Sequence, residues 1–74
     1  MSWNFRVMRH DGWLAVHEVF YDASGRPQAY GPPATFGVPD DDDLAGLIRN
    51  LLRAARNARE LPVLEETDFE GSEG

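Results

Sequence analysis

The sequence WNFRVMRH-DG-WLAVHEVFYD, residues 3–22, decides the fold. Residues 3–10 alternate between apolar and polar side chains, which is typical of a half-buried strand. Asp11-Gly12 lies between this run and a second run rich in β-formers. Such a pair favours a type I′ hairpin turn, because both central residues of that turn need positive φ. We therefore predict an antiparallel hairpin in which His10 lies opposite Trp13.

This register divides the hairpin into two faces. One face is mostly apolar and pairs Val7 with Val16, Trp3 with Phe20 and Arg9 with Leu14. Glu18, opposite Phe5, is the misfit on this face. The other face mixes apolar, aromatic and polar side chains. Its members are Asn4, Arg6, Met8, His10, Trp13, Ala15, His17, Val19 and Tyr21.

A third strand is expected after the turn cluster at residues 22–25, from about Arg26 to Tyr30. Gly31-Pro32-Pro33 should interrupt this strand, because proline cannot donate a hydrogen bond to a neighbouring strand. Residues 34–38 either continue the strand or form an extended crossover. The pattern leaves the course of residues 31–38 open.

A helix is expected from Pro39 and the acidic run at residues 40–43 to about Arg59, ending before Pro62. At 100° per residue, six apolar side chains fall within one arc of about 100°. They are Leu44, Leu47, Ile48, Leu51, Ala55 and Ala58. The opposite side carries Arg49, Arg53 and Arg56. This arginine stripe is interpreted as a solvated helix face, and a phosphate site is the alternative.

These elements predict an α+β fold of order β-β-β-α, in which one amphipathic helix packs on the apolar face of a three-stranded antiparallel sheet. Residues 1–64 form the single domain, and residues 65–74 form an acidic, flexible tail. Because one helix covers one side of a sheet, we expect the mixed face to meet water or a partner. The alternatives are that residues 31–38 or a second copy of the chain bury that face.

The net charge of −6 is confined to one end of the chain. Acids and bases balance within residues 1–39 and again within residues 40–59, so the whole excess lies in residues 60–74. A neutral domain with an acidic tail lacks the basic footprint of a nucleic-acid-binding protein. The sequence has no cysteine, no signal-peptide core and no membrane-length apolar run. We expect a soluble, cytoplasmic protein.

The residue types that carry chemistry do not form a recognisable catalytic or metal-binding set. His10 and His17 share the mixed face but are four positions apart along the hairpin, or roughly 13 Å, which is too far for one zinc ion. No serine is placed near a histidine, and no glycine-rich phosphate loop is present. The run at residues 40–43 suits helix capping better than a calcium loop. We therefore predict a protein without enzymatic activity, cofactor or metal.

The mixed sheet face is the predicted protein-binding surface, because aromatic residues, methionine and arginine are enriched in interface hot spots. The acidic run would add charge complementarity to a basic partner. The predicted partner-binding residues are Arg6, Met8, His10, Trp13, His17, Tyr21, Asp40, Asp41, Asp42 and Asp43. The chain is expected to be a monomer or a homodimer.

Three stretches resemble a group of short, uncharacterised bacterial proteins: WNFRV at residues 3–7, HEVFYD at 17–22 and PVL at 62–64. That resemblance implies the same fold and no assigned activity. The order β-β-β-α is also similar to HicB-type antitoxins, although their glycine-cysteine stretch before the helix is absent. Small size and acidity resemble phage-encoded inhibitors such as anti-CRISPR proteins. We expect a stoichiometric inhibitor that blocks a basic, nucleic-acid-binding surface, with an antitoxin-like homodimer as the alternative.

Overall fold

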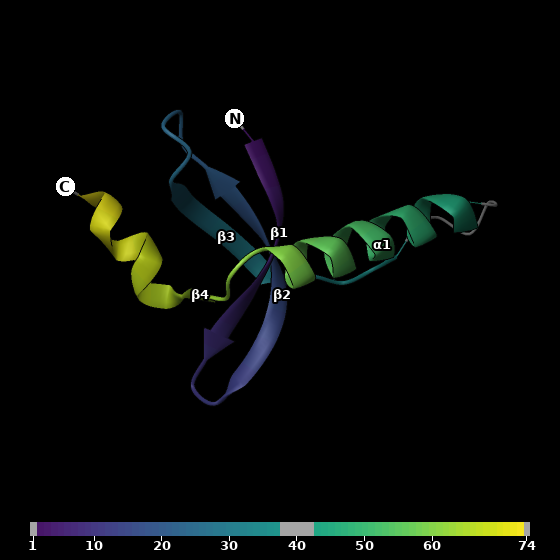
Figure 1. Ribbon diagram of the computed structural model, residues 1–74, viewed down its shortest axis with the longest axis horizontal. Coiled ribbons are helices and arrows are strands. Elements are labelled where there is room, and N and C mark those ends of the chain that lie inside the picture. The colour runs from purple at the N-terminus through teal and green to yellow at the C-terminus, as the bar shows by residue number, and fades with distance from the viewer. Residues whose placement is uncertain (1, 38–42, 74) are drawn as a thin grey trace.

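The computed structural model describes residues 2–37 and 43–73, which form an α+β fold built on a mixed four-stranded sheet (Figure 1). The strand order is β3-β2-β1-β4. The elements in chain order are β1 (Ser2–His10), β2 (Trp13–Tyr21), β3 (Pro27–Pro33), α1 (Leu44–Glu60), β4 (Leu64–Glu65) and the 3-10 helix η1 (Glu66–Glu73). Within the described residues, no helix is long and apolar enough to cross a membrane.

The predicted hairpin and its register are confirmed. Strands β1 and β2 are antiparallel, with His10 paired to Trp13 and Val7 paired to Val16. Asp11 and Gly12 have φ angles of 38° and 95°. Positive φ at both positions is what a type I′ turn requires, and an aspartate followed by a glycine tolerates it at low cost.

The third strand is longer than the sequence predicts. Strand β3 runs through Gly31-Pro32-Pro33, so the predicted interruption at these residues is wrong. It is an edge strand paired only with β2, and the pairing is irregular between His17 and Val19. Prolines are tolerated on an edge strand, because its outward backbone groups need no partner strand.

The turn between β2 and β3 is organised by Asp22. Its Oδ1 accepts hydrogen bonds from the Ser24 backbone N–H at 2.9 Å, the Ser24 hydroxyl at 2.8 Å and the Arg26 N–H at 3.0 Å. An aspartate that accepts from the residues two and four positions ahead is a common device for reversing the chain.

Helix α1 begins at Leu44, with Asp43 as its N-cap; the Asp43 carboxylate accepts from the Gly46 N–H at 3.2 Å. The predicted capping role is thus confirmed for Asp43, whereas Asp40–Asp42 lie outside the described residues. The helix ends where the Leu61 N–H donates to the Asn57 carbonyl at 3.0 Å, one residue before Pro62. The helix therefore starts later than predicted and ends as predicted.

The chain beyond α1 differs most from the prediction. Strand β4 adds a fourth strand, parallel to β1, with Leu64 beside Met8 and Glu65 beside Arg9. The predicted three-stranded antiparallel sheet is therefore incomplete. Helix η1 follows directly and packs against β3 and β1. The predicted flexibility of residues 65–74 stays a prediction.

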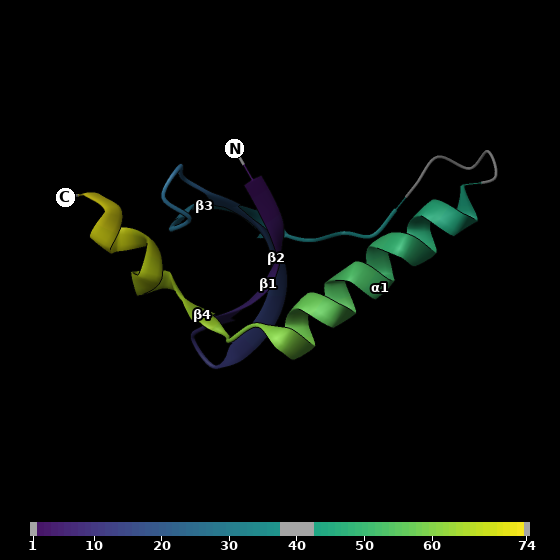
Figure 2. The same cartoon turned by 45° about the horizontal axis from the view of Figure 1, so that its top comes forward.

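Helices lie on both sides of the sheet: α1 packs against β1 on one side, and η1 packs on the other (Figure 2). Under η1 lies a small core of Met8, Val19 and Leu64, against which Tyr21 and Phe69 pack. On the α1 side, the buried Phe5 ring packs against Phe36, with ring centroids 5.5 Å apart. Helix α1 projects beyond the sheet, and the molecule measures 45 × 30 × 21 Å.

Candidate functional site

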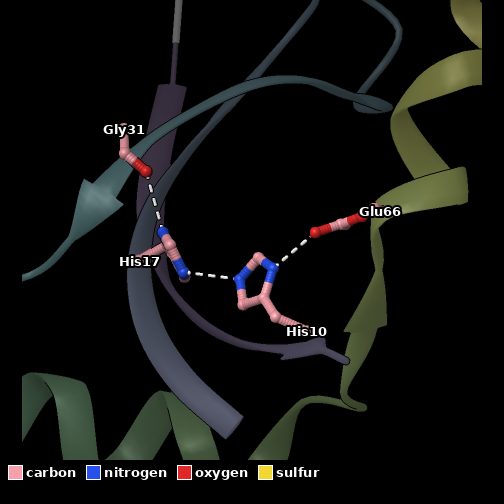
Figure 3. Close-up of polar contacts among 4 residues, drawn as sticks. All are labelled: His10, His17, Gly31 and Glu66. Carbon is pink, nitrogen blue, oxygen red and sulfur yellow. Dashed lines mark hydrogen bonds and ion pairs between the residues drawn. The ribbon is translucent and has the colours of Figure 1, made fainter. Parts of the chain in front are cut away.

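The covered face of the sheet holds a chain of hydrogen bonds that joins four elements, β1, β2, β3 and η1 (Figure 3). The His10 Nε2 and His17 Nε2 atoms are 2.8 Å apart. His17 Nδ1 lies 2.8 Å from the carbonyl oxygen of Gly31 on β3. His10 Nδ1 lies 2.6 Å from Glu66 Oε2 at the start of η1. The two imidazoles therefore link β3 to the C-terminal segment across the hairpin.

The sequence placed these two imidazoles too far apart. The expected separation of about 13 Å describes backbone positions on a straight ladder, whereas the hairpin curls strongly (Figures 1 and 2). Each histidine side chain also extends several ångströms toward the other. The ring centroids consequently lie 4.8 Å apart. The predicted separation of the two imidazoles is therefore wrong.

The partners of the imidazoles define their proton count. A carbonyl oxygen only accepts, so His17 Nδ1 donates to Gly31. An ionised Glu66 also only accepts, so His10 Nδ1 donates to it. The Nε2–Nε2 contact needs one further proton. Three hydrogen bonds thus hold three protons, one more than two neutral imidazoles carry. All three contacts are satisfied when His10 donates to both Glu66 and His17 and His17 donates to Gly31.

Arg6 is a second polar group buried under the C-terminal segment, with 8% of its surface exposed. Its Nη1 donates to the Tyr21 hydroxyl at 2.9 Å, and that hydroxyl donates to Asn4 Oδ1 at 2.7 Å. Its Nη2 donates to the Pro62 carbonyl at 2.8 Å, while Nε is buried without a partner in the described structure. Arg6 therefore ties the segment after α1 to the sheet.

These groups have the contacts of structural residues. All four imidazole nitrogens are already engaged, so none is free to take a proton from a substrate. The two histidines also lack a further ligand, since the described residues contain no group of three or more histidine, cysteine, aspartate or glutamate side chains that could hold a metal. Zinc sites in proteins generally use at least three such ligands.

The predicted partner-binding face lies largely inside the molecule. Met8, His17 and Arg6 are buried, with exposed fractions of 0%, 2% and 8%. His10 and Tyr21 are half-buried, and only Trp13 is freely exposed. The expectation of an open sheet face is therefore wrong, because residues 64–69 of the same chain cover it. Of the predicted acidic residues, Asp43 caps α1 and Asp40–Asp42 lie outside the described residues.

The exposed apolar surface lies on α1 instead. The helical arc that the sequence assigns to the core points largely outward: Leu44 is 64% exposed, Ile48 46% and Leu51 44%. Ala55 and Ala58 complete this row and are also exposed. Leu52 borders it with 64% of its surface exposed. We call Leu44, Ile48, Leu51, Ala55 and Ala58 the apolar stripe.

The helix is turned away from its predicted orientation by polar contacts to β1. The side-chain oxygen of Asn57 accepts from the Phe5 N–H at 3.2 Å. The Arg53 guanidinium lies 4.2 Å from the Trp3 ring centroid and donates to the Trp3 carbonyl at 3.2 Å. Arg53 is exposed, as the interpretation of a solvated arginine face expects, and in addition contacts β1. Gly46 and Ala54 are the buried positions of the helix.

The stripe is regular as well as exposed. Its five residues are separated by 4, 3, 4 and 3 positions, which is the spacing of the a and d positions of a coiled coil. The sequence analysis identified these residues as one apolar face but expected the sheet to cover them. Periodicity shows which side of a helix is apolar and not what covers that side.

A comparison with known proteins found no matching family model, curated protein or solved structure. The candidate site is therefore defined by geometry. Glu66 and Phe69 were missed by the sequence prediction, although Phe69 is the only apolar side chain after Leu64 and could have indicated that the segment packs. Its ring lies 4.8 Å from that of Tyr30.

Proposed function

We propose that this protein functions by binding other protein chains and carries out no chemistry of its own. The observation that carries the proposal is the apolar stripe on α1. Exposed apolar patches rimmed by charges are typical of protein-binding surfaces. On α1, Arg49 and Arg56 lie beside Leu52 and provide such a rim. A helix that presents apolar side chains at regular spacing is also a common recognition element.

The second part of the proposal concerns charge. Residues 60–74 carry the whole net charge of −6. Helix η1 (Glu66–Glu73), which holds most of these acids, lies across the sheet from α1 (Figure 2). This acidic end would suit a basic surface of a larger protein and would accelerate association with it. A stoichiometric inhibitor or adaptor that occupies a nucleic-acid-binding surface, in the manner of anti-CRISPR proteins, is the form of the function we propose.

Affinity capture with a matched pair of variants tests the role of the stripe. Leu51→Glu places a carboxylate in the stripe, and Asn50→Glu places one at the neighbouring exposed position outside it. Proteins captured by wild type and by Asn50→Glu should be lost from Leu51→Glu. Identical captured proteins for all three chains would overturn the proposal that the stripe binds protein.

The acidic end is tested by salt and by charge removal. Capture of a basic partner should weaken as ionic strength rises, because exposed charges are screened beyond about 8 Å at 0.15 M salt. Replacing both Glu70 and Glu73 with glutamine should weaken it further. Partner binding that is insensitive to both changes would contradict the electrostatic part of the proposal.

A further inference from the structure

We infer that the apolar stripe of α1 is the interface between two copies of this chain, with their α1 helices paired antiparallel across a two-fold axis. This inference rests on the proposed function, because it names the chain that occupies the stripe. The acidic helix η1 of each copy would then lie on the outer side of the pair, where a larger partner can reach it.

The spacing of the stripe favours a helix as its occupant. Residues repeated at 4, 3, 4 and 3 positions form a narrow seam that a second helix fills by knobs-into-holes packing. Leu44, Ile48 and Leu51 remain between 44% and 64% exposed in the single chain. Helix α1 runs away from the sheet on the side opposite η1, so its outer surface is open along its length (Figure 2).

Side-chain size along the stripe indicates an antiparallel pair. The N-terminal half carries the large residues Leu44, Ile48 and Leu51, whereas the C-terminal half carries Ala55 and Ala58. A parallel pair would place large against large at one end and leave a gap between alanines at the other. An antiparallel pair places large against small at both ends, which keeps the distance between the helices even.

Charge along the helix indicates the same orientation. Asp43 caps the N-terminus, and Asp40–Asp42 precede it in the sequence, whereas the last turns carry two bases, Arg56 and Arg59, against one acid, Glu60. Antiparallel pairing brings the acidic N-terminus of each α1 helix beside the basic C-terminal turns of the other α1 helix. A two-fold axis makes this contact twice, because the same surface is used on both copies. The helix dipoles also oppose each other in this orientation. A parallel pair would place like charges together.

Solution mass tests whether the pair exists. Size-exclusion chromatography with light scattering should give twice the chain mass of 8.3 kDa for wild type and for Asn50→Glu. Leu51→Glu should give the single-chain mass with an unchanged circular dichroism spectrum, since Leu51 is 44% exposed in the single chain. A monomeric wild type, or a dimer that Leu51→Glu leaves intact, would overturn the inference.

Cysteine cross-linking tests the orientation of the two helices. Because the sequence has no native cysteine, only the introduced cysteines can form a disulfide. Leu52→Cys lies near the middle of the helix and should form a disulfide with its own copy on oxidation. Ala45→Cys lies near one end and should cross-link with Arg59→Cys when the two variants are mixed, but not with itself. Self-cross-linking of Ala45→Cys would show a parallel pair and would overturn the antiparallel arrangement.

The outcomes separate this inference from the proposed function. If wild type is monomeric but other proteins are lost from Leu51→Glu in the capture experiment, the stripe binds a different chain. The inference then fails while the proposed function stands. If wild type is monomeric and no protein depends on the stripe, both fail.

Discussion

Asn57→Ala is the change that most directly tests how α1 is attached to the sheet. The Phe5 N–H points away from β2 and donates to Asn57 Oδ1 at 3.2 Å. Strand β4 pairs with β1 only at Met8 and Arg9, so it does not reach this position. Phe5 is 5% exposed. Removing the amide therefore leaves the Phe5 N–H without its acceptor, in a place that water reaches poorly.

The magnitude follows from two opposing effects. An unpaired buried donor costs about 1–3 kcal/mol, and the length of this bond puts it near the lower end. Replacing asparagine by alanine within a helix returns about 0.5 kcal/mol through helix propensity. Asn57→Ala should therefore lower the free energy of unfolding by about 1 kcal/mol. Asn50→Ala, at an exposed position of the same helix, should raise it by about 0.5 kcal/mol.

Urea denaturation, followed by the fluorescence of Trp3 and Trp13, measures the free energy of unfolding of both variants. The difference between the two values removes the contribution of helix propensity, which both variants share. Hydrogen exchange at the Phe5 amide should also accelerate in Asn57→Ala and stay unchanged in Asn50→Ala. If both variants gain stability equally and Phe5 exchange is unaffected, Asn57 does not anchor the helix. The explanation of the outward apolar stripe would then be refuted.

Three further changes test the covered sheet face and the β2–β3 turn. Met8→Ala should cost about 2–5 kcal/mol, because Met8 is 0% exposed; a loss below 1 kcal/mol in thermal or urea denaturation would mean that the C-terminal segment does not cover it. Glu66→Ala should cost about 1 kcal/mol in the same assay by leaving His10 Nδ1 without its acceptor, whereas Glu66→Gln should cost less because its side-chain oxygen can still accept from that nitrogen; equal losses would contradict the proposed hydrogen bond. The Ser24 hydroxyl lowers the pKa of Asp22 below 3.8, so the stability that the ionised Asp22 carboxylate provides is present above that pH and is lost as the pH falls through the lowered value. An acid titration of wild type against Asp22→Asn should show this loss in wild type alone, and matching acid profiles would refute it.

The hairpin could be predicted residue by residue because local chemistry determines it. A two-residue turn with positive φ at Asp11 and Gly12 fixes the register, and every pair then follows from the period of two. No distant part of the chain is needed to reach that result. The same locality explains why the helix end before Pro62 was also predicted correctly.

The orientation of α1 could not be predicted, because it depends on contacts far apart in the sequence. The apolar arc is correct as a pattern, but Asn57 and Arg53 bind β1 through polar groups that lie outside that arc. A hydrophobic pattern takes no account of a single side-chain oxygen that accepts a hydrogen bond from a buried N–H. The pattern predicts that the stripe is buried somewhere, and the monomer leaves it exposed.

The covered sheet face was missed for a related reason. Residues 65–74 are acidic and nearly devoid of apolar side chains, so composition indicates a mobile tail. A few specific contacts nevertheless dock residues 64–69: Leu64 pairs beside Met8, Glu66 binds His10, and Phe69 packs against the core. Composition averages over a segment, whereas two or three well-placed side chains are enough to dock it.

These two errors have a common consequence for function. The sequence placed the exposed apolar surface on the sheet and the buried one on the helix, and the structure exchanges them. A chain of 74 residues has few apolar side chains to spare for a thin core. Leaving three large aliphatic residues of α1 in water is therefore costly unless a partner covers them. The regular 4-3 spacing, the large and small halves and the opposed charges all fit one partner, which is the same helix reversed.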